Sequence, residues 1–144
     1  MFEKILYPTD FSDVAKKALE YITQLKDAGA KEVVVLHVID QRTLDASGEL
    51  QTKGVLGAIE GIEQDAEKNA NSVRDKLANL GFKTKVLVEK GNPLREILRI
   101  EDEENVSAIV MGSHGKSNVK EMLLGSVSEK VVRKAKKPVL VVKR

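Results

Sequence analysis

Short runs rich in apolar and β-branched residues alternate along the chain with longer stretches in which apolar residues recur every three or four positions. The short runs predict strands at residues 4–7, 33–39, 84–88, 108–111 and 138–142. The run at 33–39 is apolar throughout apart from His37, as expected of a strand whose two faces are both covered. The longer stretches between the runs predict amphipathic helices.

Each predicted helix has boundary signals. Ser12 or Asp13 can cap a first helix, which the segment 28–30 ends. Gly81 ends a long second helix, and Asn92 followed by a proline opens a third. A fourth covers about residues 126–135, whereas residues 40–56 lack periodicity and predict a long, mobile connection. The apolar faces of the first three helices contain Val14, Ala18, Ile22 and Leu25; Ile59, Ile62, Ala66, Val73, Leu77 and Leu80; and Leu94, Ile97 and Leu98.

Strands and helices therefore alternate from end to end, which predicts an α/β fold with an open parallel sheet and helices on both faces. Such sheets bind ligands at the carboxyl ends of their strands, where the strand order reverses. Neither a linker nor an internal repeat is evident, so we expect residues 1–144 to form a single domain.

Composition narrows the possible partners. A net charge of +2 and an aromatic content of 3% argue against nucleic acid and anionic membranes. The chain has no cysteine, which excludes disulfides, thiolate metal sites and cysteine nucleophiles. The first residues lead directly into a predicted strand, without a signal-peptide core or an 18-residue apolar stretch, so we expect a cytoplasmic protein that does not enter a membrane.

A glycine motif follows the apolar run at 108–111. Gly112 and Gly115 are separated by two residues, and nine more precede Gly125 and Ser126. Glycine lets backbone N–H groups approach an anion without an intervening Cβ, and a helix N-terminus, predicted here near Ser126, also binds phosphate. The motif therefore predicts a cradle for a polyphosphate.

Two related motifs do not fit. Gly115-Lys116-Ser117 resembles the end of a Walker A loop, but that loop requires a glycine at position 110, which is a valine. The residues after the first strand, 8–12, also lack the G-x-G-x-x-G fingerprint of dinucleotide-binding folds.

The chain resembles the universal stress protein family over essentially its whole length. The resemblance rests on residues 5–12 (ILYPTDFS), 36–40 (LHVID), the glycine motif and 137–142 (KPVLVV). It implies a Rossmann-like, five-stranded parallel sheet in the order 3-2-1-4-5 and a homodimer. Because no position of the glycine motif departs from the family pattern, the ATP-binding branch is implied. The strand order places Asp10 and Gly112 at the same crevice.

The resemblance also implies roles for individual residues. The backbone near Pro8, Thr9 and Val38 would line an adenine, Asp10 would contact base or ribose, and Met111 would pack against the nucleoside. The loop around ribose and phosphates would comprise Gly112, Ser113, His114, Gly115 and Lys116, and further donors to phosphate would come from Gly125, Ser126, Val127 and Ser128. The implied ligand is ATP, or AMP or ADP, with Mg²⁺ or Mn²⁺ arriving on a triphosphate.

Simpler structural roles compete with these. Asp10 can be a turn residue, and Ser126 with Glu129 forms a capping-box sequence. His37 fits a hydrogen-bonded core histidine better than a ligand, and His114 a backbone contact better than a catalytic imidazole. Lys116 can bind phosphate or be solvated. The acidic run at 101–104 predicts a solvated helix end rather than a metal site.

Three functions remain open. The leading one is a nucleotide-dependent regulatory dimer, joined through residues 138–142, that acts on an unidentified protein partner in a stress response. The second is a slow ATPase, in which Asp10 or His114 orients water and Lys116 stabilises charge, although the usual catalytic apparatus for phosphoryl transfer is missing. The third is an interaction module in which bound nucleotide only supports the fold.

Overall fold

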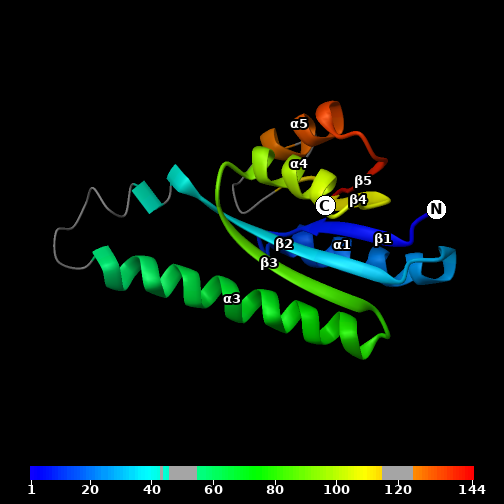
Figure 1. Cartoon of the computed structure of the whole chain (residues 1–144), viewed down its shortest axis with the longest axis horizontal. Coiled ribbons are helices and arrows are strands. Elements are labelled where there is room, and N and C mark those ends of the chain that lie inside the picture. The colour runs from blue at the N-terminus through cyan, green and yellow to red at the C-terminus, as the bar shows by residue number, and fades with distance from the viewer. Residues whose placement is uncertain (43, 46–54, 115–124) are drawn as a thin grey trace.

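The computed structural model describes residues 1–42, 44–45, 55–114 and 125–144 (Figure 1). Strands and helices alternate as the sequence predicts. Their bounds are β1 (Lys4–Pro8), α1 (Asp13–Leu25) with a 3-10 turn at Lys26–Ala28, β2 (Glu32–Asp40), α3 (Val55–Asn79), β3 (Lys83–Gly91), α4 (Pro93–Glu103), β4 (Ala108–Gly112), α5 (Ser126–Lys134) and β5 (Val139–Val142).

All five strands are parallel and form one sheet in the order β3-β2-β1-β4-β5, which confirms the predicted α/β fold and strand order. Leu6 of β1 is paired with Val34 of β2 on one side and with Ile109 of β4 on the other. The chain thus builds outward from β1 in one direction and then, from β4, in the other. The reversal lies between β1 and β4, where parallel sheets open a crevice for ligands.

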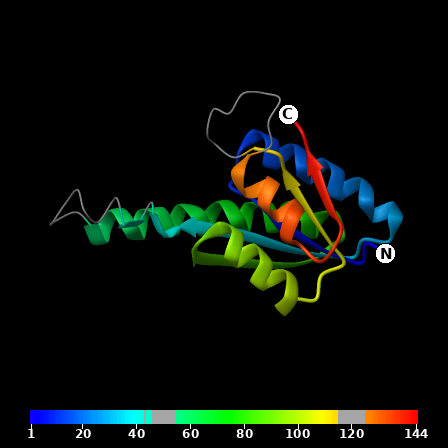
Figure 2. The same cartoon turned by 90° about the horizontal axis from the view of Figure 1, so that it is seen from above.

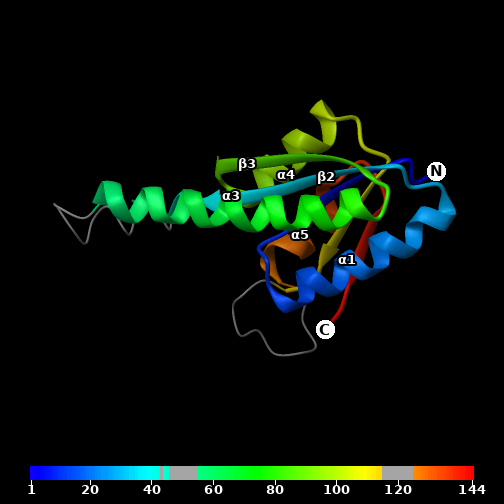
Figure 3. The ribbon, with the colours of Figure 1, turned by 90° about the horizontal axis from the view of Figure 1, so that it is seen from below.

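Two helices cover each face of the sheet. In β1, Ile5 and Tyr7 point to the face packed by α1 and α3, whereas Leu6 points to the face packed by α4 and α5. Figure 2 shows α4 and α5 from above, and Figure 3 shows α1 and α3 from below. Residues 5–7 are at most 1% exposed, because a strand between two helical layers buries successive side chains on opposite sides.

The predicted caps open the first and third helices. Ser12 Oγ accepts a hydrogen bond from the Ala15 amide at 3.3 Å, and Asn92 Oδ1 accepts one from the Arg95 amide at 3.0 Å. Each bond satisfies one of the N–H groups that a helix start leaves without an internal partner. These caps fix where α1 and α4 begin, both next to the carboxyl ends of strands.

The connection predicted at 40–56 is partly helical. Residues 41–42 and 44–45 have helical geometry, and α3 already begins at Val55; residues 43 and 46–54 lie outside the described residues. Leu44 is 6% exposed and packs in a cluster with Ile39 and Ala66. Leu80, placed on the apolar stripe by its spacing, instead follows the last turn of α3 and is 43% exposed. No helix in the described ranges is long and apolar enough to cross a membrane.

The acidic run at 101–104 is not simply a solvated helix end. Glu101 is only 2% exposed and accepts the backbone N–H groups of Lys136 and Lys137, each at 2.8 Å. Its position four residues after the buried Ile97 turns it inward, against the turn that precedes β5. Glu104 bonds the side chains of Lys4 and Lys85. The prediction is therefore wrong for the first and last residues of the run.

Candidate functional site

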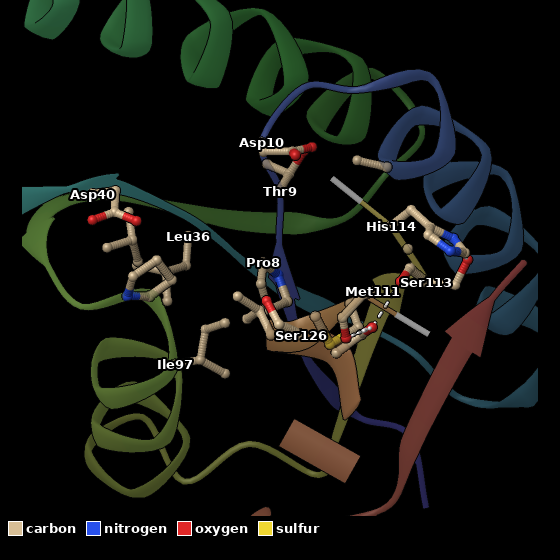
Figure 4. A pocket seen from close by; sticks show the side chains of 17 residues that line it. Pro8, Thr9, Asp10, Leu36, Asp40, Ile97, Met111, Ser113, His114 and Ser126 are labelled. Atoms are coloured by element: carbon tan, nitrogen blue, oxygen red, sulfur yellow. Dashed lines mark hydrogen bonds between the residues drawn. The ribbon is translucent and has the colours of Figure 1, made fainter. Parts of the chain in front are cut away.

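A cavity of about 520 Å³ opens at the carboxyl ends of β1, β2 and β4 (Figure 4). This size is typical of pockets for small organic ligands. Every predicted site residue within the described ranges lines it, whereas Gly115 and Lys116 lie outside those ranges. The lining residues are Pro8, Thr9, Asp10, Ala15, Leu36, Val38, Asp40, Pro93, Ile97, Met111, Gly112, Ser113, His114, Gly125, Ser126, Val127 and Ser128.

The two ends of the cavity differ in chemistry. Leu36 and Asp40 of β2 and Ile97 of α4 lie at one end, and Ser113 and His114 lie at the other (Figure 4). The first end is mainly apolar, and the second consists mainly of backbone at the two halves of the glycine motif. A ligand that fills the cavity therefore meets apolar walls at one end and hydrogen-bonding backbone at the other.

The turn after β1 is held by its own side chains. The Phe11 amide donates to Thr9 Oγ1 and the Ser12 amide donates to Asp10 Oδ1, each at 3.0 Å. Phe11 adopts φ 64°, a left-handed conformation that is costly for an aromatic residue. Asp10 thus stabilises the turn, as its sequence position allows. The hydrogen bond from Ser12 uses Oδ1 and does not involve Oδ2.

His37 supports this turn from the face of β2 opposite Leu36 and Val38. Its Nδ1 lies 2.7 Å from the Thr9 carbonyl oxygen, and its ring centroid lies 4.6 Å from that of Phe11. The hydrogen bond predicted for this histidine is confirmed. The strained Phe11 is therefore stacked on a residue of β2.

Gly112 and Gly125 lie too close to neighbouring protein atoms to carry a side chain. A Cβ on Gly112 would lie 2.8 Å from Val14 Cγ1 and 3.1 Å from the Val14 carbonyl carbon, in the first turn of α1. A Cβ on Gly125 would lie 2.9 Å from the Ser113 carbonyl oxygen. Sequence reasoning attributed both glycines to the approach of an anion; the structure shows that close packing of the chain already requires them.

The Ser113 carbonyl joins the two halves of the motif. It accepts the Gly125 amide and the Ser128 hydroxyl, each at 2.7 Å. Ser128 Oγ also lies 3.0 Å from the Gly125 carbonyl oxygen, and Ser128 is 3% exposed. Because this hydroxyl is engaged with backbone, the group that Ser128 can offer a ligand is its N–H.

The start of α5 has no side-chain cap. Gly125 is the N-cap residue, with φ −63° and ψ 156°, and Ser126 is the first helical residue, so the alternative of a capping box led by Ser126 is wrong. The N–H groups of Ser126, Val127 and Ser128 belong to the first turn, where a helix provides no internal acceptor. They carry the positive end of the helix dipole at the cavity wall.

His114 is 6% exposed, and its Nδ1 lies 2.7 Å from Ser113 Oγ. Its Nε2 is buried and makes no hydrogen bond within the part of the chain that the structure describes. The side chain is thus fixed beside Ser113 (Figure 4), and the backbone of His114 belongs to the cavity wall.

The end of β2 presents backbone groups to the cavity. The Thr9 amide donates to the Leu36 carbonyl at 2.9 Å, so the polar backbone groups of Leu36 face β1. Alternation along a strand turns the N–H and C=O of Val38 the same way, but β1 ends at Pro8, opposite Leu36. Val38 therefore offers an adjacent donor and acceptor at the cavity wall.

Sequence reasoning missed five lining residues. Leu36 and Asp40 share the face of Val38 by strand alternation, and Pro93 and Ile97 share a helix face by their spacing of four, so both patterns were present in the sequence. Ala15 lines the cavity because α1 starts there. The sequence patterns did not show that α4 packs next to the end of β2.

Comparison with known proteins agrees with this fold. The model of the universal stress protein family matches residues 1–143, so the chain belongs to that family. The chain is 42% identical to universal stress protein MJ0577 of Methanocaldococcus jannaschii, over all of this chain and 96% of the relative. It is 34% identical to universal stress protein YxiE of Bacillus subtilis, over 99% of this chain and all of the relative.

Solved structures share the fold. That of MJ0577 superposes with a TM-score of 0.90 at 43% identity, covering all of this chain and 97% of the other. A universal stress protein family member from Arabidopsis thaliana, with AMP bound, has a TM-score of 0.64 at 16% identity over 98% of this chain and 91% of the other. The second likeness concerns the fold alone.

Proposed function

We propose that this protein binds an adenine nucleotide, ATP or its products ADP and AMP, in the cavity. The observation that carries the proposal is the N-terminus of α5, which has no side-chain cap, facing the same cavity as the backbone donor and acceptor of Val38, for which the described residues provide no partner. The first suits a phosphate and the second suits the edge of a base. The family membership supports the same ligand class.

In this arrangement the base lies between the β2 end and α4, against Leu36, Val38 and Ile97, and the phosphates lie at the first turn of α5. Asp10, fixed through Oδ1, presents its second oxygen to ribose or base. The described residues contain no group of three metal ligands, so a Mg²⁺ or Mn²⁺ ion would be held mainly by phosphate oxygens and water.

The magnitude is consistent with a working affinity. Charge-assisted hydrogen bonds contribute roughly 1.5–3 kcal/mol each. Four or five of them, less an association cost of several kcal/mol, give about −8 kcal/mol, or low-micromolar binding. Calorimetry with ATP, ADP and AMP tests this directly, and mass spectrometry of freshly purified protein would identify a retained nucleotide. No heat with any of the three, at tens of micromolar protein, refutes the proposal.

A proline substitution isolates the phosphate contact. Ser126 is the first helical residue, where proline fits, and the φ and ψ of Gly125 are those that a residue before proline prefers. Ser126→Pro thus removes one N–H from the cavity wall while preserving the helix. We expect roughly tenfold weaker ATP binding, equivalent to about 1.4 kcal/mol. Ser126→Ala, which keeps the N–H, is the matched control; equal affinities of the two variants would contradict the phosphate position.

We further propose that bound nucleotide sets the state of a homodimer formed through β5, which then acts on a protein partner. Val139–Val142 is an edge strand of the sheet. Leu140 is 40% exposed and Val132 of α5 is 46% exposed, and unprotected apolar edges favour pairing with another chain. Light scattering at micromolar concentration tests this: a dimer that Leu140→Lys dissociates is expected, whereas a monomeric wild type refutes it.

A further inference from the structure

Asp40 lies at the end of the cavity opposite α5 (Figure 4). It is the last residue of β2 and continues the row of Leu36 and Val38, whose side chains alternate onto the α4 and α5 face of the sheet. Its side chain is 25% exposed. It lies at the predominantly apolar end of the cavity, where we place the base, whereas Asp10, the other lining carboxylate, lies on the turn after β1.

Arg42 holds this carboxylate in one orientation. The Arg42 amide and Nε donate to Oδ1 at 3.0 and 3.2 Å, and Nη2 donates to Oδ2 at 2.8 Å. The hydrogen bond from the Arg42 side chain lowers the pKa of Asp40, and this effect exceeds the opposing effect of burial. The carboxylate is therefore charged at neutral pH. A carboxylate oxygen accepts two hydrogen bonds, so Oδ2, with one donor from Arg42, has capacity for a donor from a ligand.

The two ends of the cavity therefore have opposite electrostatic character. The positive end of α5 lies at one end and a negative carboxylate at the other. β2 and β4 are separated by β1 alone, so the two ends are about two strand spacings, or roughly 10 Å, apart. A ligand that spans this distance must be anionic at one end and must present a hydrogen-bond donor, rather than a second acceptor, at the other.

We propose that Asp40 is a specificity-determining residue that selects a nucleotide base with an exocyclic amino group over the corresponding keto base. This inference rests on the proposed function. An amino N–H donates to Oδ2, whereas a keto oxygen in its place would face a carboxylate with no proton between them. Arg42 acts through Asp40 as a positioning residue, because its guanidinium binds both carboxylate oxygens and so fixes their orientation.

The test compares ATP with inosine triphosphate, which carries an oxygen at the position of the amino group and a proton on the neighbouring ring nitrogen. The Val38 backbone can also distinguish these two bases, so the contribution of Asp40 is read from the change in the affinity ratio on substitution. Calorimetry with the full chain gives the ratio of the two affinities. We expect the wild type to prefer ATP by at least tenfold. Asp40→Asn, whose amide both donates and accepts, should reduce the ratio about tenfold. Asp45→Asn removes the same charge from an exposed residue outside the cavity wall and should leave the ratio unchanged.

Arg42→Ala provides a second variant that keeps the Asp40 carboxylate and should retain a preference for ATP. A ratio in Asp40→Asn equal to that of the wild type overturns the inference while leaving nucleotide binding intact. Loss of preference in Arg42→Ala but not in Asp40→Asn also overturns it, because the discrimination would then come from the guanidinium. Failure of the wild type to bind either nucleotide overturns the proposed function itself, and this inference with it.

Discussion

Replacing Gly112 with alanine tests whether close packing, rather than ligand approach, requires this glycine. The new Cβ would lie 3.1 Å from the carbonyl carbon of Val14 and 3.2 Å from the amide nitrogen of Ala15, besides 2.8 Å from Val14 Cγ1. The valine methyl can move, but the two backbone atoms belong to the first turn of α1, which the Ser12 cap holds in place. The start of α1 must therefore shift by a few tenths of an ångström.

Overpacking of this kind costs roughly 1–3 kcal/mol. Gly112 does not have a left-handed backbone, so no conformational penalty adds to the contact. For a chain of 144 residues, each kcal/mol lowers the melting temperature by about 4 °C, so we expect a decrease of roughly 4–12 °C.

Urea denaturation followed by circular dichroism measures the free energy of unfolding without any ligand. Gly61→Ala is the matched control, because a Cβ on Gly61 in α3 meets nothing within 4 Å. Alanine in a helix interior is favoured over glycine, so this variant should gain about 0.5–1 kcal/mol. A Gly112→Ala protein as stable as the wild type, with the control behaving as expected, would refute the packing argument.

Three further predictions concern titratable groups. Hydrogen bonds from Lys85 and then Lys4, opposed by burial, lower the pKa of Glu104. The stability that Glu104 contributes is therefore present above its pKa in the unfolded chain and is lost as pH falls through its pKa in the folded protein. Glu104→Gln should flatten the acid side of a plot of stability against pH, and an unchanged acid side would contradict this. Burial raises the pKa of Tyr7 from 10.0 to about 12. As pH rises above about 10, this phenol ionises in the unfolded chain before it ionises in the folded protein, so stability should fall. Tyr7→Phe should abolish that part of the decline, measured by denaturation between pH 9 and 11. Glu101→Ala removes a buried carboxylate and leaves two partly buried N–H groups without an acceptor. It should cost about 2–4 kcal/mol in urea denaturation, whereas Asp102→Ala, at an exposed neighbour, should cost less than about 1 kcal/mol.

Local signals predicted most of the fold. Alternating strand and helix patterns gave the order of elements, because strands buried on both faces are continuously apolar and the caps Ser12 and Asn92 mark helix starts. The order of strands in the sheet came from the family resemblance, since strand pairing depends on contacts between distant segments. The same limit explains Glu101, whose burial depends on a turn 35 residues later.

The sequence pointed to most of the residues that line the cavity, but not to the structural reasons for their identity. Gly112 and Gly125 lie at the cavity, but contacts with Val14 and the Ser113 carbonyl require their lack of a side chain. Ser126 fits a capping box by spacing, yet the helix begins one residue too early for it to cap. A motif shows that glycine is required at a position, whereas the three-dimensional packing shows whether the ligand or the fold requires it.

Helix α4 extends from the cavity to the edge of the sheet. Pro93 and Ile97 line the cavity at its start, and Glu101 near its end bonds the two residues that precede Pro138 and β5. Eleven residues of helix form a rod of about 16 Å. If a ligand displaced the first turn of this helix, the anchor of the edge strand would move with it. Helix α4 therefore links the cavity physically to the surface through which we propose that a second chain pairs.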